Sequence, residues 1–161
     1  MVIFDDDTIA QLIAEVKPLP KDALKKLRPD LSSGKGRREL EIVGAGGSEF
    51  RVMVRQVVKY PDNFSVILAF KMPNSSAVFV LRRYNSKEEH TNRLEGETFF
   101  GYHIHMATQR YQEVGRREEC YALATDRYSN VMTAIECLID DCGFQRHPDE
   151  EYDRSLLRGL Q

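Results

Sequence analysis

The feature that most constrains the fold is an alternation of apolar and polar residues that recurs, between short breaks, from residue 39 to residue 105. Within it, Phe50, Val52 and Val54 occupy every second position, and a period of two is typical of a half-buried β-strand. The breaks are too short for the crossovers that join parallel strands, so neighbouring strands are expected to pair antiparallel. The pattern predicts five strands, over 39–43, 49–60, 64–72, 77–84 and 97–105.

The segments between the expected strands are rich in turn-forming residues. The sequences GAGGS (44–48), PDN (61–63) and PNSS (73–76) predict tight turns, whereas 85–96 is expected to form a longer loop. GAGGS lacks the lysine and the following helix of a phosphate-binding loop, so we interpret it as a hairpin turn.

Helical periodicity lies on both sides of the strand region. Before it, the aspartates at 5–7 offer N-caps for a first helix, and 22–27 predicts a short second one. After it, 106–114 predicts one or two helical turns, and 127–141 places its apolar residues on a single stripe. Such a stripe is expected to cover one face of the sheet.

These elements predict an α+β fold: a curved, half-barrel-like, five-stranded antiparallel meander packed by helices from both ends of the chain. A length of 161 residues suits one domain. We expect that domain to divide into a helical N-terminal segment, a sheet, a helical cover and an acidic tail. Their expected ranges are 1–30, 38–106, 107–145 and 146–161.

Cysteine content and the first residues indicate where the chain resides. Three cysteines in unrelated settings predict free thiols rather than a disulfide framework, which is typical of a reducing compartment. The N-terminus lacks the basic region of a signal peptide, and no apolar run approaches the ~20 residues of a membrane span. We therefore expect a soluble, cytoplasmic protein that does not act in a membrane.

The charge of the chain is unevenly distributed. A net charge of −2 disfavours a surface built throughout for nucleic acid. Residues 21–39, however, hold seven Lys or Arg against three Asp or Glu, and this excess predicts a local patch that faces phosphates. The residues expected to contact a nucleic-acid backbone there are Lys25, Lys26, Arg37 and Arg38.

A second unusual stretch, 81–111, contains three of the four histidines and four arginines. Because alternate residues of a strand share a face, His103 and His105 are expected to point the same way. The opposite set is apolar and is expected to face the core; it comprises Phe100, Tyr102, Ile104 and Met106. His90, in the expected loop, is positioned to fold back over the histidine face.

An arginine from the preceding strand is expected to complete this group. Arg82 shares a face with Tyr84, and Arg83 lies on the other face. The strand register decides which arginine meets the histidines, and the sequence leaves it open, with Arg82 and Tyr84 slightly favoured. Arg93 and Arg110 are interpreted as surface residues.

Three short motifs in this stretch resemble a known family. The sequences RYN (Arg83, Tyr84 and Asn85), HTN (His90 and Asn92) and HIH (His103 and His105) are similar to the pattern of TumE-type bacterial toxin proteins, over residues 81–105. This chain is longer than those proteins, and its spacing between the second and third motifs differs.

The resemblance implies metal-independent RNA cleavage, with no cofactor, and a helix-turn-helix antitoxin as protein partner. One histidine would take the proton of the 2′-hydroxyl, another would protonate the leaving oxygen, and Arg82 or Arg83 would stabilise the transition state. The substrate would be oriented by Tyr84, Asn85 and Asn92.

Two other functions remain open from the same residues. The three histidines of this stretch form a ligand set that suits zinc, iron or manganese: His90, His103 and His105. Cupin barrels also bind metals through an H-x-H motif, but the later acid and the distant histidine that complete their sites are missing here. Alternatively, the chain is a non-enzymatic RNA- or protein-binding accessory factor of a phage, plasmid or defence system, which would depend on its basic segment rather than on a histidine. An exposed edge strand would also allow two copies to pair.

Overall fold

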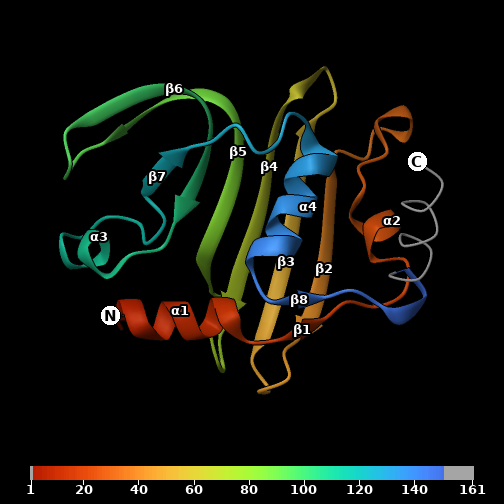
Figure 1. Cartoon of the computed structure of the whole chain (residues 1–161), viewed down its shortest axis with the longest axis horizontal. Helices are drawn as coiled ribbons and strands as arrows, with labels where there is room; N and C mark the ends of the chain where they lie inside the picture. Colours follow the sequence, from red (N-terminus) through yellow and green to blue (C-terminus); the bar gives the residue numbers. More distant parts are fainter. Residues whose placement is uncertain (1, 151–161) are drawn as a thin grey trace.

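The computed structural model describes residues 2–150, and its largest element is an open, six-stranded antiparallel sheet in the order β2-β3-β4-β5-β6-β7 (Figure 1). The predicted α+β class and the antiparallel meander are confirmed. The sheet has one strand more than predicted, and it does not close. Its strands are β2 (Arg37–Val43), β3 (Glu49–Val57), β4 (Tyr60–Lys71), β5 (Val78–Asn92), β6 (Glu97–Met106) and β7 (Tyr121–Ala124).

Helices from both ends of the chain pack against this sheet. Figure 1 shows α4 lying along one face of the central strands, α1 crossing near one end of the sheet and α2 beside its β2 edge. A short parallel pair, β1 with β8, joins the segments that follow α1 and α4. These elements are α1 (Asp6–Ala14), β1 (Lys17–Pro18), α2 (Ala23–Leu27), the 3-10 helix η1 (Leu31–Ser33), α3 (Gln109–Glu113), α4 (Val131–Asp141) and β8 (Phe144–Gln145).

Helix α4 supplies most of the cover over the sheet. Asn130 and Thr133 form a capping box at its start, and Gly143, with φ of 76°, follows its end. Its buried stripe of apolar side chains meets an equally buried row from the central strands. The stripe comprises Val131, Ala134, Ile135, Leu138 and Ile139, and the row comprises Val52, Val54, Phe64, Val66, Leu68 and Tyr84.

A buried lysine joins the N-terminal segment to the segment that follows α4. Lys17 is fully buried, and its Nζ lies 2.8 Å from the carbonyl oxygens of Leu12, Ile13, Glu15 and Cys142. These carbonyls lie in the last turn of α1 or at the C-caps of α1 and α4, where backbone acceptors lack helical partners. The ammonium therefore satisfies acceptors from both ends of the chain at one point.

Several predicted boundaries are wrong, each for a local reason. Strand β4 begins at Tyr60, so PDN (61–63) lies within a strand and the turn falls at 58–59. Strand β5 continues through the expected loop 85–96 as far as Asn92. The polar residues of this stretch pair with β6 in a hairpin that requires few buried apolar side chains, so the sequence shows no apolar alternation there. Strand β7 lies within 107–145, which was expected to be a helical cover. It is only four residues long, which is too short for the alternation of a strand to show in the sequence. Of the expected tail 146–161, residues 151–161 lie outside the described part of the chain.

Within residues 2–150, no helix is long and apolar enough to cross a membrane.

Candidate metal centre

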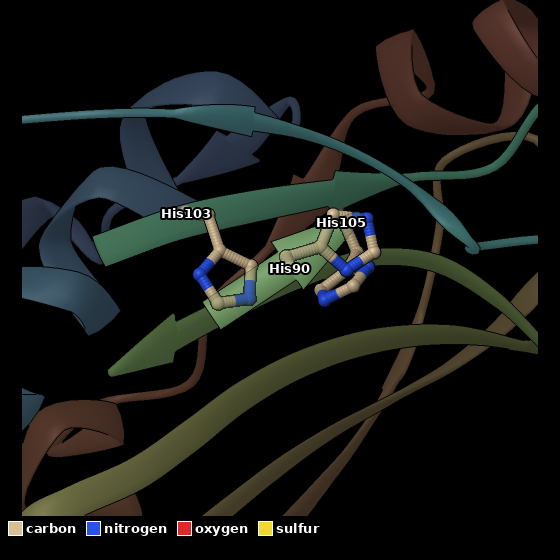
Figure 2. Close-up of side chains that lie close together, drawn as sticks. All are labelled: His90, His103 and His105. Atoms are coloured by element: carbon tan, nitrogen blue, oxygen red, sulfur yellow. The ribbon is translucent and has the colours of Figure 1, made fainter. Parts of the chain in front are cut away.

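The hairpin of β5 and β6 brings three histidines together on one face (Figure 2). One ring nitrogen from each of His90, His103 and His105 lies within 4.8 Å of the others. The ring centroids are 4.8 Å apart for His90 and His105, 4.9 Å for His103 and His105, and 5.5 Å for His90 and His103. The expected pairing of His103 with His105 is present, and His90 joins them.

An irregularity in β5 accounts for the position of His90. Asn85 pairs with His103, but the next pair along the hairpin is Glu88 with Gly101, so β5 holds one residue more than β6 over this interval. Beyond this bulge, His90 lies opposite Phe99, on the face that carries His103 and His105. His90 therefore reaches the cluster from a strand, not from the predicted loop.

Backbone carbonyls fix the proton positions on two of the imidazoles. Nδ1 of His103 lies 2.9 Å from the carbonyl oxygen of Gly101, and Nδ1 of His105 lies 2.8 Å from that of Glu119. A carbonyl oxygen only accepts, so each Nδ1 carries the proton and donates it. In the neutral ring, Nε2 of each histidine then keeps its lone pair.

An asparagine does the same for the third imidazole. The side chain of Asn92 donates through Nδ2 to the carbonyl oxygen of Ala122 at 2.7 Å, and its Oδ1 accepts from the backbone N–H of Ala122 at 2.9 Å. Its orientation is thereby set, and Oδ1 also accepts from Nε2 of His90 at 2.8 Å. Nδ1 of His90 therefore keeps its lone pair as well.

The surroundings keep two of these rings neutral near pH 7. Burial lowers the pKa of His103 below its ordinary value of 6.5. Burial, reinforced by the imidazoles of His103 and His90, lowers the pKa of His105 to about 3. Neutral histidine is the form that binds metals or accepts a proton, whereas a general acid must carry its proton at the working pH.

The nitrogens of the cluster lie slightly farther apart than one metal ion would hold them. Imidazole nitrogens bind zinc at about 2.1 Å, so even two ligands on opposite sides of the ion span only about 4.2 Å. The three nitrogens lie within 4.8 Å of one another, so at that separation the rings would move together by about half an ångström or more when a metal binds. Histidines that bind metals commonly donate their other N–H to a carbonyl or amide oxygen, as all three do here.

The register also settles which arginine meets the histidines. Arg83 lies directly opposite His105, so the preference for Arg82 with Tyr84 is wrong. Arg82 shares the opposite face with Tyr84, which is fully buried and donates its hydroxyl to Asp141 at 2.7 Å. Tyr84 thus contributes to the core beneath α4 and does not reach the histidine face.

The two asparagines of the predicted substrate set are also buried. Asn85 lies opposite His103 and accepts a hydrogen bond from Ser65 at 2.9 Å. Asn92 is 1% exposed, and its polar atoms bond to His90 and Ala122. Both side chains hold neighbouring groups in place.

The basic N-terminal residues lie far from the cluster. Arg37 and Arg38 belong to β2, which is separated from β6 by three strands, or roughly 19 Å across the sheet at the usual strand spacing. Lys25 and Lys26 belong to α2, beside the same edge (Figure 1). The structure therefore does not bring the two predicted groups of site residues together.

A pocket of about 260 Å³ adjoins the histidines, and sequence analysis missed most of its residues. His90, His105 and Arg83 line it together with Thr91, Arg93, Tyr111, Arg116, Arg117, Glu119 and Cys120. Arg93 is exposed, as expected of a surface residue, and it also borders the site, whereas Arg110 pairs with Glu95 at the surface. The run GRREE at 115–119 was the one signal in the sequence that pointed to this charge.

Phe100 also departs from its predicted place. It was expected in the core with Ile104, yet it is 71% exposed. The outer part of the β5–β6 hairpin extends beyond the cover given by α4, so its second face has no layer to pack against (Figure 1).

Comparison of the chain with models of protein families, with curated proteins and with solved structures gave no match.

Proposed function

We propose that the protein is a metal-dependent enzyme whose centre consists of His90, His103 and His105. The observation that carries the proposal is the direction of three hydrogen bonds. Each imidazole donates one N–H to a fixed oxygen and keeps the lone pair of its other nitrogen, the arrangement found in metal centres with a supporting outer shell.

Zinc is the metal that this ligand set favours. Imidazole ligands suit zinc, copper, iron and nickel, and sites with three protein ligands leave a position for water or substrate. A zinc ion held in this way supplies a Lewis acid and an acidified water for hydrolysis. The adjoining pocket gives a substrate access to His90 and His105.

The chain's own residues would orient the reacting groups. The carbonyl of Glu119 holds the ring of His105 in one tautomer. Its side chain is 5% exposed and lies 3.4 Å from Arg83, and burial raises the pKa of the Glu119 carboxyl. A carboxyl with a raised pKa beside the pocket is suited to hold a proton during turnover.

Metal content tests the proposal directly. Elemental analysis by mass spectrometry is expected to find about one zinc ion per molecule of the untagged chain. Each of three variants is expected to lose that zinc: His90→Ala, His103→Ala and His105→Ala. His147→Ala is the matched control, because His147 lies outside the cluster. Wild-type protein that gains no stoichiometric divalent metal, even after incubation with zinc, would contradict the proposal.

A metal-independent ribonuclease of the TumE type is the second candidate. Arg83 opposite His105, and the arginine-lined pocket beside them, favour it because charge on a phosphorane needs a cationic partner. Cleavage of RNA in EDTA, abolished by His103→Ala or His105→Ala, would establish this activity. Absence of cleavage under those conditions would remove it.

The binding-only alternative depends on other residues. Reversal of charge at Lys25, Lys26, Arg37 and Arg38 would abolish RNA binding that uses the β2 edge, and His103→Gln would leave such binding intact. An electrophoretic mobility assay with single-stranded RNA distinguishes this function from the other two.

A further inference from the structure

The pocket beside the histidine cluster carries a large excess of positive charge. Arg83, Arg93, Arg116 and Arg117 line it, against the single carboxylate of Glu119. The wall also includes His90 and His105, and the neutral ring of each presents the lone pair of one nitrogen. A pocket with four guanidinium groups and one carboxylate attracts an anion.

These arginines are weakly engaged by the protein itself. Arg83 and Arg117 approach Oε1 of Glu119 at 3.4 and 3.5 Å, longer than the 2.7–2.9 Å of a strong charge-assisted hydrogen bond. By contrast, Arg127 binds both oxygens of Asp141, at 2.7 and 2.9 Å. Within residues 2–150, no ion pair joins Arg93 or Arg116 to a carboxylate.

Two buried polar atoms in the same group have no partner. Oε2 of Glu119 and Nε of Arg83 are both buried and lack a hydrogen bond within the described chain. Buried polar groups are normally satisfied, so the unpaired donor Nε of Arg83 at the pocket wall indicates a site that lacks an acceptor, such as an oxygen of a bound anion. Oε2 of Glu119 is itself an acceptor and does not contribute to anion binding.

We propose that this pocket binds the phosphate monoester group of a small substrate, next to the metal ligands. A phosphate monoester carries up to two negative charges on three terminal oxygens, which matches several arginine forks better than a carboxylate or a singly charged phosphodiester does. The volume of about 260 Å³ lies below the usual range of 300–1,000 Å³ for ligand pockets, so the bound part of the substrate is small. The inference rests on the proposed function, because the reacting group would lie between the arginines and His90 and His105.

A binding experiment with three related anions tests it. Phenylphosphonate resists hydrolysis and carries the dianionic group, its monomethyl ester carries one charge, and benzoate is the carboxylate of similar shape. Isothermal titration of zinc-loaded protein at pH 8 is expected to show phenylphosphonate binding at least about 10-fold more tightly than either of the others. Equal affinity for all three, or preference for benzoate or the monoester, would overturn the proposal.

Arginine variants locate the binding. Arg116→Gln combined with Arg117→Gln is expected to lower phenylphosphonate affinity about 10-fold or more, in the zinc-loaded and in the metal-free protein. Arg28→Gln combined with Arg55→Gln is the matched control, because both arginines are exposed and neither lines this pocket. An unchanged affinity in the first variant would place the anion elsewhere and overturn the proposal.

The two proposals fail in different ways. Zinc binding without phosphonate binding would overturn the anion pocket and leave the metal centre standing. Phosphonate binding that depends on Arg116 and Arg117 in a protein that never binds zinc would support the pocket and refute the proposed function.

Discussion

Asn92 forms two hydrogen bonds with the backbone of Ala122, donating to its carbonyl oxygen at 2.7 Å and accepting from its N–H at 2.9 Å. The side chain of Asn92, on β5, thereby forms with the backbone of β7 the kind of paired hydrogen bonds that a neighbouring strand would form. The same amide oxygen accepts from His90, so attachment of the edge strand and orientation of the imidazole depend on one residue.

Asn92→Ala is expected to lower zinc affinity by about 10- to 100-fold, because outer-shell partners of histidine ligands contribute about that much. The metal ligands themselves are unchanged in this variant. Competition with a chromophoric zinc chelator measures the effect. Asn63→Ala is the matched control, since Asn63 is exposed on β4. Equal affinities in the two variants would show that Asn92 does not orient His90.

The stability of the metal-free protein is expected to fall as the pH is lowered from about 6.5 to about 3. The folded-state pKa of His105 is about 3, against an ordinary value of 6.5, so the unfolded chain binds more protons in this interval. Stability therefore rises with pH across it, and the loss by pH 4 is on the order of 2–4 kcal/mol.

Urea denaturation at a series of pH values, in the presence of EDTA, measures that dependence. His105→Gln removes this group and is expected to reduce the slope of the profile, with the rest of the slope coming from His103, whereas His147→Gln keeps the full slope. A wild-type profile that is flat between pH 6.5 and 4 would contradict the prediction.

Arg83→Met is expected to weaken phenylphosphonate binding about 10-fold, and Arg82→Met is expected to leave it unchanged. The reason is the register, which puts Arg83 opposite His105 and Arg82 on the face of Tyr84. Titration calorimetry on both variants checks this pair. A stronger effect from Arg82→Met would mean that the hairpin is paired differently in solution.

Lys17→Met is expected to cost about 3 kcal/mol of unfolding free energy, because four carbonyl oxygens around Nζ would lose their donor in a buried place. Urea denaturation at pH 7 gives the value. Lys35→Met, at an exposed position, serves as the control and is expected to change stability by less than about 0.5 kcal/mol. A similarly small effect for Lys17→Met would contradict the role given to this ammonium.

The elements that the sequence predicted well are those with a strong local signal. The cap at Asp5, the apolar stripe of α4 and the shared face of His103 and His105 each depend on residues close together in the chain. The antiparallel order of β2 to β6 followed from short connections in the same way.

The features that could not be predicted from the sequence depend on partners distant in the chain. The register of β5 against β6 decides between Arg82 and Arg83, and no local pattern encodes it. Strand β7 is four residues long and is held partly by Asn92, which is 30 positions away from Ala122. The histidine cluster was predicted correctly as a group, but His90 reaches it by a route that the sequence did not indicate.

The bulge in β5 has a consequence for insertions and deletions. In a regular strand, residues on one face are separated by even numbers of positions, yet Arg83 and His90, seven positions apart, share a face because of the extra residue between Asn85 and Glu88. Removing the bulge together with its extra residue would leave a spacing of six, which a regular ladder also places on one face. Chains that preserve this centre should therefore combine an odd spacing between the arginine and the first histidine with a bulge, or an even spacing with a regular strand. Closing the bulge without removing its extra residue would turn His90 to the opposite side of the hairpin.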